Sequence, residues 1–402
     1  MLCAGLGLAW PSPVLVKLNN ATETVLPRVI TAEEGSWIVS IGFLAGIIAN
    51  LLIGTTLIDL LGRKPFLILV CLPKFVTGFL YIYASEVWML LLGRALVGIA
   101  DAGIFTILPM YSSEIASSCF DVGTVTLQLS TSPFNLKIPG HKAEALKVLT
   151  FLRGSETQAK EEIAEFEKAD EMNTESVSKK DLIKNRLFLK SLILVLTLGF
   201  GSQFVGFNAV SFYLQTVLES TQTSVRPEMA SVTIGLIQLF ASFCTTLVTD
   251  RFGRKPILSV TCVGMGIGMF GLGLFFKLKE SGPVDGFMNY VPLISLILVV
   301  FCYSAGIGSL MWVLNAELFD GPSRGIGMSV SLVMTTLFLF LLTKYFAIVS
   351  LSIGPAITYW IFSVNCVLLC VFIMVCIPET KGRTFAEIQD ILRGKKEENT
   401  KC

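Results

Sequence analysis

Acidic and basic side chains recur in two nearly identical short stretches of an otherwise apolar chain. The stretch DLLGRKP covers residues 59–65, and DRFGRKP covers residues 250–256, so the same residue types return after 191 positions. Gly allows a sharp turn there, and Pro fits the first turn of a following helix. An Arg guanidinium can bind a carboxylate through two parallel hydrogen bonds. The repetition therefore predicts two related halves, each with an ion-pairing loop.

Each half also offers an acidic partner for its repeated arginine. Glu114 lies in PMYSSEIA in the first half, and Glu317 lies in WVLNAELFDGPSR in the second. We predict an Arg63–Glu114 pair in the first half and an equivalent cluster in the second. With the acidic residues that open the two repeats, the predicted charge clusters are Asp59, Arg63 and Glu114, and Asp250, Arg254, Glu317 and Arg324. Near solvent, each pair is worth about 1 kcal/mol.

Two further charges, Lys74 and Asp101, lie inside apolar runs and not in a loop. In two antiparallel helices joined by a short turn, they stand about 14 and 16 Å above the same membrane boundary, at 1.5 Å per residue. A lone charge at that depth is costly, whereas a matched pair relieves much of the cost. One hypothesis is a Lys74–Asp101 ion pair. The other has Asp101 facing a cavity as a proton or substrate-hydroxyl partner, with Lys74 reaching the interface alone.

The elements that hold these residues are long apolar runs. The chain is 53% hydrophobic and 15% charged, and its mean hydropathy is +0.72. Runs near or above the roughly 20 residues that cross a bilayer predict an all-α, polytopic membrane protein with about ten spanning helices. A marginal first run at 1–16 is interpreted as a shortened helix. The other predicted runs are 36–58, 66–84, 87–111, 188–217, 229–249, 256–276, 291–313, 325–346 and 354–377.

The one long polar stretch separates two hydrophobic blocks and predicts four regions. These are an N-terminal transmembrane half at 1–118, a linker with helices at 119–187, a C-terminal six-helix half at 188–378 and a tail at 379–402. Most of the 31 Lys and Arg residues fall on the side of the repeated loops, which predicts a cytoplasmic linker and C-terminus. The opposite side is assigned Lys17, Arg28, Arg226, Lys277, Lys279 and Lys344. This topology places the sequon at Asn20 outside, where glycosylation is possible.

Several function classes find no support in the residues. There is no nucleophile–base pair, no phosphate-binding loop and no Cys/His spacing for a metal, and the lone His141 lies in a charged loop. The formal net charge of +1 argues against a nucleic-acid partner. We therefore expect no enzyme, no cofactor and no metal site. The expected partners are the lipid bilayer and a small molecule, and the oligomeric state is left open.

In these motifs the chain resembles the sugar porters of the major facilitator superfamily, among them the facilitated trehalose- and glucose-type transporters. The matching pieces are DLLGRKP, GRALVGIADAG, PMYSSEIA, GSQFVGFNAVSFY, DRFGRKP, WVLNAELFDGPSR and PETKGR. The resemblance implies two six-helix halves around a central substrate site, which rock between outward-open and inward-open states. It also implies that the loop charges form cytoplasmic pairs that hold the outward-open state.

The resemblance further implies a set of sugar-binding residues in the second half. Gln203 and Asn208 match the seventh helix, and Trp312 matches an aromatic residue of the tenth. Ser202, Gln238 and Thr335 replace the family's usual Gln, Asn and Asn. Amides and hydroxyls pair with sugar hydroxyls, because an unpaired buried hydroxyl costs about 1–3 kcal/mol. Gln203 and Asn208 lie about 140° apart on a regular helix, and a local break at Gly206 would bring them closer.

The chain also departs from the family pattern. The segment SSCFDVGTVTLQLSTSPF stands where the family has its fifth and sixth helices, and the start of the first helix is missing. We expect a facilitative, uniport-type carrier of a sugar such as trehalose or a hexose, in the cell membrane. The alternative is a transport-incompetent truncated isoform that acts as a sensor or interaction partner.

Overall fold

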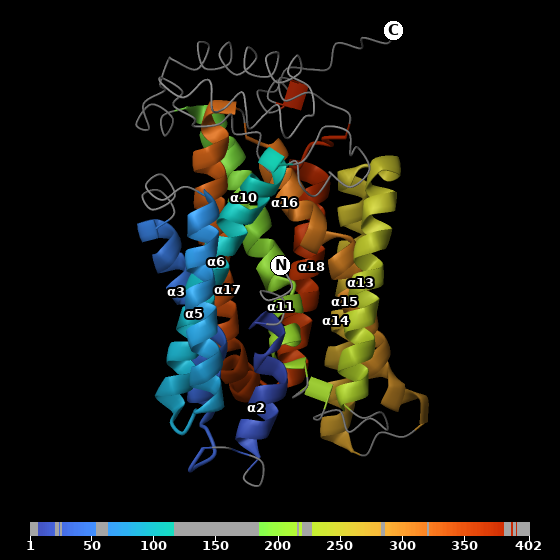
Figure 1. Cartoon of the computed structure of the whole chain (residues 1–402). Coiled ribbons are helices and arrows are strands. Elements are labelled where there is room, and N and C mark those ends of the chain that lie inside the picture. The colour runs from blue at the N-terminus through green and yellow to red at the C-terminus, as the bar shows by residue number, and fades with distance from the viewer. Residues whose placement is uncertain are drawn as a thin grey trace.

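The described part of the chain is an assembly of long helices. The computed structural model describes residues 7–20, 24, 26–53, 63–115, 185–214, 217–218, 227–282, 286–319, 321–381, 387–388 and 391. Within these ranges every regular element is helical. Figure 1 shows the helices running roughly parallel to one another, with α2 towards one end of the assembly and α16 towards the other. We call the end near α2 the outer end and the opposite end the inner end.

The helices form an N-terminal and a C-terminal group. The N-terminal group consists of α2 (Pro11–Asn19), α3 (Ala32–Ile53), α5 (Arg63–Ile82) and α6 (Val87–Ile115). The C-terminal group consists of α10 (Arg186–Phe204), α11 (Phe207–Phe212), α13 (Pro227–Phe252), α14 (Arg254–Ser281), η2 (Gly286–Tyr290), α15 (Val291–Ala305), α16 (Ile307–Glu317), α17 (Gly321–Ile353) and α18 (Pro355–Cys376).

Eight helical segments of the described residues are long and apolar enough to cross a membrane. The predicted run 66–84 corresponds to α5, whose apolar part, Ile68–Ile82, is shorter than these eight. The first predicted run contains the nine-residue α2. Each of the nine predicted runs from 36–58 onward thus coincides with a helix or a broken pair of helices. The all-α, polytopic fold is confirmed.

Two predictions fall wholly or mainly on residues that the structure does not describe. The loss of the fifth and sixth helices concerns residues 116–184, which lie outside the described ranges together with most of the tail beyond Lys381. The predicted linker at 119–187 overlaps the described residues only at its end. Of the predicted boundaries, only the one at 118 lies outside the described residues, and those at 118, 187 and 378 all stay predictions.

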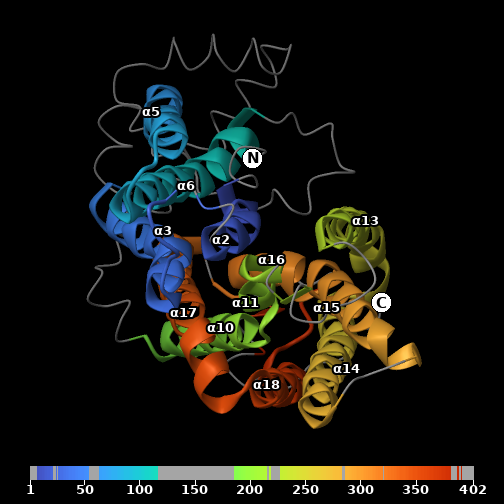
Figure 2. The same cartoon turned by 90° about the horizontal axis from the view of Figure 1, so that it is seen from below.

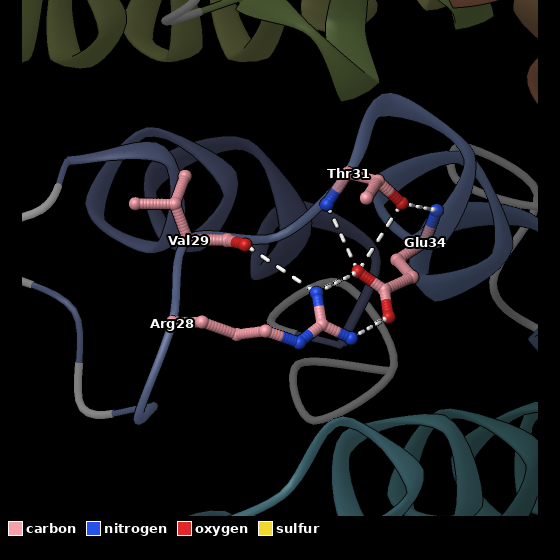
Figure 3. Close-up of polar contacts among 4 residues, drawn as sticks. All are labelled: Arg28, Val29, Thr31 and Glu34. Atoms are coloured by element: carbon pink, nitrogen blue, oxygen red, sulfur yellow. Dashed lines mark hydrogen bonds and ion pairs between the residues drawn. The ribbon is translucent and has the colours of Figure 1, made fainter.

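A capping box fixes the start of α3 (Figure 3). The backbone N–H of Thr31 donates to the Glu34 carboxylate over 2.9 Å, and the N–H of Glu34 donates to the Thr31 hydroxyl over 3.2 Å. This reciprocal pairing satisfies two N–H groups that the first turn of a helix leaves without partners. Arg28 also donates to Glu34, over 2.9 Å from Nη1 to Oε2. The first turn of α3 is thus held in a defined register.

Glycines bring α3 and α6 into backbone contact. A Cβ atom added to Gly98 of α6 would lie 1.8 Å from the carbonyl oxygen of Gly42 on α3. A Cβ added to Gly46, one turn further along α3, would lie 3.1 Å from the Gly98 carbonyl oxygen. Gly42 and Gly46 form a small-xxx-small pattern, which lets membrane helices approach closely where van der Waals packing drives association.

The two groups meet mainly through α3 and α17, which lie side by side in both views (Figure 2). The short helices α2 and α11 add a second contact. The rings of Phe43 on α3 and Phe212 on α11 meet edge to face, with their centroids 5.5 Å apart. The groups are therefore joined by packed side chains, and residues of one group can affect the other.

Large apolar side chains cover the outer surfaces of several helices. Phe75 on α5, Leu247 on α13 and Val375 on α18 are 68%, 74% and 76% exposed. In water such a surface would drive aggregation, whereas hydrocarbon covers it at no cost. Together with the eight possible spans, this surface indicates an integral membrane protein.

Candidate functional site

A sharp break separates α10 from α11 at Gly206. Gly206 has a φ of +86°, in the left-handed region that favours glycine. A Cβ atom here would also lie 2.4 Å from the Phe362 ring of α18, so a side chain is excluded by space as well as by backbone conformation. The chain therefore leaves the axis of α10 and starts again as α11.

The break brings Gln203 and Asn208 into direct contact. Asn208 Nδ2 donates to Gln203 Oε1 over 2.7 Å, and Gln203 Nε2 donates to the Ser202 hydroxyl over 3.4 Å. Gln203 is only 5% exposed. The prediction that a break at Gly206 draws the two amides together is confirmed. Two linked amides with further donors and acceptors form a polar patch that can pair with hydroxyl groups.

Two aromatic rings lie beside this patch. Phe207, directly after the break, stacks on Tyr303 of α15, with ring centroids 3.7 Å apart and an angle of 10° between the planes. Asn208 also interacts with the Tyr303 side chain. Reasoning from sequence missed Tyr303, because nothing in the apolar run 291–313 sets this residue apart.

Ser202 directly precedes Gln203, and Thr335 of α17 lies against Gly199, one turn before Gln203 on α10. The Ser202 hydroxyl donates to the Gly199 carbonyl over 2.7 Å, so its hydrogen is already bonded within α10. Thr335 of α17 faces Gly199 so closely that a Cβ there would lie 2.7 Å from its hydroxyl oxygen. This buried hydroxyl has no hydrogen-bond partner among the described residues, which leaves it free to bind one.

Trp312 and Gln238 are less closely tied to the patch. Trp312 is half-buried on α16 and follows Met311, whose side chain also reaches Gly199. Gln238 is exposed on α13, one turn from the buried Ile234 and Ala241. The structure shows no contact between Gln238 and the amide pair, so its membership of one shared site stays a prediction.

Two asparagines in the described C-terminal group, the buried Asn315 and the half-buried Asn365, were also missed. Asn365 of α18 donates to the Gly201 carbonyl over 3.0 Å, and Asn315 of α16 donates to the Ser331 hydroxyl over 3.1 Å. The Asn315 carbonyl oxygen has no partner among the described residues. Each asparagine is a polar residue within an apolar run, and this signal could have found both of them.

At the inner end, the predicted pairing of Arg254 with Glu317 is present. Arg254 Nη2 lies 3.3 Å from Glu317 Oε1, and both side chains are largely buried. The side chains of the other predicted members lie outside the described residues. They are Asp59, Arg63, Glu114, Asp250 and Arg324.

Glu379, in the PETKGR motif, completes this inner cluster. Its carboxylate accepts the backbone N–H groups of Arg254 and Lys255 over 3.0 and 3.1 Å, at the N-terminus of α14. It also accepts those of Thr380 and Lys381. A carboxylate is favoured there, because the first N–H groups of a helix lack partners and carry partial positive charge. Burial of the Glu379 carboxylate raises its pKa, but these donors lower it by more, so the pKa lies below its ordinary value.

We expect Glu379→Gln to lower the melting temperature of the purified protein at pH 7. The amide keeps the shape but loses the charge, and charge-assisted bonds at a helix N-terminus are worth about 1 kcal/mol. Because the pKa is depressed in the folded state, this stabilisation is present above the unfolded pKa and is lost as the pH falls through the folded pKa. The difference from wild type should therefore shrink in acid. Glu280→Gln, in an exposed pair with Lys277, is the control and should change little.

Within the N-terminal group, Lys74 and Asp101 form the predicted ion pair. Lys74 Nζ lies 2.6 Å from Asp101 Oδ1, between α5 and α6. Arg94, a further buried cation on α6, also attracts the Asp101 carboxylate. Arg94 donates to the backbone carbonyls of Gly7, Ile38 and Val39 over 2.7 to 3.3 Å, and so ties α6 to the N-terminal segment and to α3.

This geometry agrees with what comparison with known proteins shows. The chain matches the family described as sugar (and other) transporter over residues 14–120 and 122–392. It belongs to the sugar porters of the major facilitator superfamily. It is 29% identical to a facilitated trehalose transporter of Polypedilum vanderplanki, over 98% of this chain and 86% of that protein. A facilitated trehalose transporter of Apis mellifera ligustica is 28% identical, with 96% and 85% covered.

Solved structures share the fold. An inward-open form of the xylose transporter XylE from E. coli matches 97% of this chain and 97% of its own, with a TM-score of 0.73 and 21% identity. A partially occluded form of XylE has a TM-score of 0.74 at 20% identity. At these identities the likeness shows the fold alone. In this chain, the amide pair of Gln203 and Asn208 lies in the C-terminal helix group of that fold.

Proposed function

We propose that the chain carries a sugar, trehalose or a hexose, through the cell membrane by facilitative alternating access, with its C-terminus in the cytoplasm. The observation that carries the proposal is the Asn208–Gln203 amide pair at the Gly206 break. It offers donors and acceptors to sugar hydroxyls beside the stacked Phe207 and Tyr303 rings. Sugars bind in proteins through this combination of amides with aromatic faces.

Membership of the sugar transporter family supports the proposal, and so do the relatives described as trehalose transporters. The exposed Asn20 at the outer end of α2 agrees with the proposed orientation. Its glycosylation stays a prediction, to be tested by treating the expressed protein with a glycosidase. Facilitative transport predicts that uptake is insensitive to a protonophore.

We expect wild-type protein expressed in oocytes to take up radiolabelled trehalose or glucose, and Asn208→Ala or Gln203→Ala to lower the uptake at least about tenfold. A tenfold loss corresponds to about 1.4 kcal/mol, within the range for an unpaired buried hydroxyl. Uptake is divided by the amount of protein at the surface. Asn289→Ala, in the outer η2 turn, is the amide control and should behave as wild type.

Wild-type protein that reaches the surface but shows only background uptake of both sugars would contradict the proposal. It would favour the transport-incompetent sensor instead. Normal uptake by both alanine variants would show that the sugar binds elsewhere. Uptake abolished by a protonophore would replace uniport by proton coupling.

A further inference from the structure

Lys344 is a buried cation that the candidate site does not use. The sequence assigns it to the outer side, and the structure places it within α17, which extends to Ile353. Lys344 is 7% exposed. It lies about 35 Å along α17 from the inner end, at 1.5 Å per residue, and thus near the outer end of the molecule.

The partners of Lys344 belong to the other helix group. Its Nζ donates to the Ser36 hydroxyl of α3 over 3.0 Å and lies 3.9 Å from the centroid of the Trp37 ring. The Trp37 ring also packs against Phe340, one turn before Lys344, with centroids 6.3 Å apart. Glu33, in the first turn of α3, adds an electrostatic attraction. The ammonium group therefore bridges α17 and α3.

This contact differs in kind from the inner Arg254–Glu317 pair. Its direct partners are a hydroxyl and an aromatic face, which bind an ammonium group more weakly than a carboxylate does. If α3 and α17 part at the outer end, Lys344 loses both partners but regains water. The ammonium group can therefore leave these partners for water when the outer end opens, as a switching element requires.

We propose that Lys344, Ser36 and Trp37 form an outer latch, which is closed in this structure and must open when the outer end opens. The proposal rests on alternating access as the proposed function. The capping box at Thr31 and Glu34 supports it, because it holds the first turn of α3 and hence the two residues that receive the lysine. Lys344 acts here as a positioning residue and not as a sugar ligand.

The latch predicts that substitutions of Trp37 on α3 and of Lys344 on α17 change the stability of the closed state in opposite directions. Trp37→Leu removes the ring that compensates the buried ammonium, so the closed state is weakened. Lys344→Met keeps an apolar stem that packs well when closed and is exposed to water when open, so the closed state is strengthened. A merely structural contact predicts that both substitutions weaken closure.

The measurement is the labelling rate of a reporter cysteine by a membrane-impermeant thiol reagent on intact cells. Ser40→Cys serves as the reporter, because Ser40 is fully buried one turn inward from Ser36. Each variant without the reporter gives the background from native cysteines. We expect Trp37→Leu to raise the rate about tenfold, a shift of about 1.4 kcal/mol, and Lys344→Met to lower it by a similar factor.

Further variants keep the test decisive. Lys344→Arg retains a cation that stacks on aromatic rings and should label near the wild-type rate. Trp37→Phe should raise the labelling rate less than Trp37→Leu. It replaces the leucine variant in the assay if that variant fails to reach the cell surface. Lys277→Met, which alters an exposed pair elsewhere at the outer end, should leave the rate unchanged.

Equal rates in all variants, or a change in the same direction for Trp37→Leu and Lys344→Met, would overturn the latch. The assay contains no sugar, so it is separate from the test of transport. Labelling that follows the prediction in a protein without sugar uptake would leave the latch standing and overturn the proposed function alone.

Discussion

Gly98→Ala is expected to leave little folded protein in the membrane. The added methyl group would lie 1.8 Å from the Gly42 carbonyl oxygen, a distance at which α3 and α6 must move apart. Overpacking of a tight interface costs about 1–3 kcal/mol, and here the obstacle is backbone, which cannot rotate aside. Separation of the helices would also strain the Arg94 bonds to Ile38 and Val39. We expect most of the protein to be lost from a size-exclusion profile in mild detergent.

Gly78→Ala on α5 is the matched control for this substitution. It adds the same methyl group in the same helix group, but nothing lies within 4 Å of the new atom. Alanine favours helix over glycine by about 1 kcal/mol, so this variant should be as stable as wild type or slightly more so. A Gly98→Ala protein that elutes and melts like Gly78→Ala would show that α3 and α6 do not meet as described.

Breaking the Lys74–Asp101 pair from either side is expected to destabilise the N-terminal group more than removing both charges. Lys74→Met leaves a buried carboxylate, and Asp101→Leu leaves a buried ammonium group without its partner at 2.6 Å. Removing one member of a buried pair costs about 3–5 kcal/mol, whereas replacing both by apolar residues of similar volume is often neutral. The double variant should therefore recover most of the folded protein lost in each single variant.

Exchanging the two charges is a weaker test than the neutral double variant, Lys74→Met with Asp101→Leu. Asp101→Lys would place an ammonium group where Arg94 now attracts a carboxylate, so even the complete swap should rescue folding only in part. Melting temperature and sugar uptake are measured on the same variants. Recovery of both in the neutral double variant means that the pair is structural. Recovery of stability without uptake would assign Asp101 a role in transport.

The helices and the break between α10 and α11 could be predicted because their signals are local. Run length and hydropathy placed nine runs on helices, and a glycine between two amides marked the turn at Gly206. The Lys74–Asp101 contact could also be predicted, because a short turn fixes the depth of both neighbouring helices. In each case a few consecutive residues or one adjacent helix pair determines the geometry.

The contacts that could not be predicted join segments far apart in the chain. Glu379 binds the N-terminus of α14, and Lys344 binds Ser36 of the other group. Hydropathy gives no information on which helices become neighbours. Lys344 near the end of the run 325–346 indicates the outer side, but it gives no sign that the ammonium group contacts Ser36 of α3.

The three carbonyl bonds of Arg94 have a consequence for the order of assembly during synthesis. Gly7, Ile38 and Val39 are translated before Arg94, so the segments that carry them enter the membrane while their partner is still in the ribosome. The N-terminal segment can take its final place only after α6 has been inserted and its guanidinium has reached the Gly7 carbonyl. The segment that carries Gly7 is thus made before α6 but docks only after it, and a pause in translation after α3 would prolong the lifetime of an incomplete bundle.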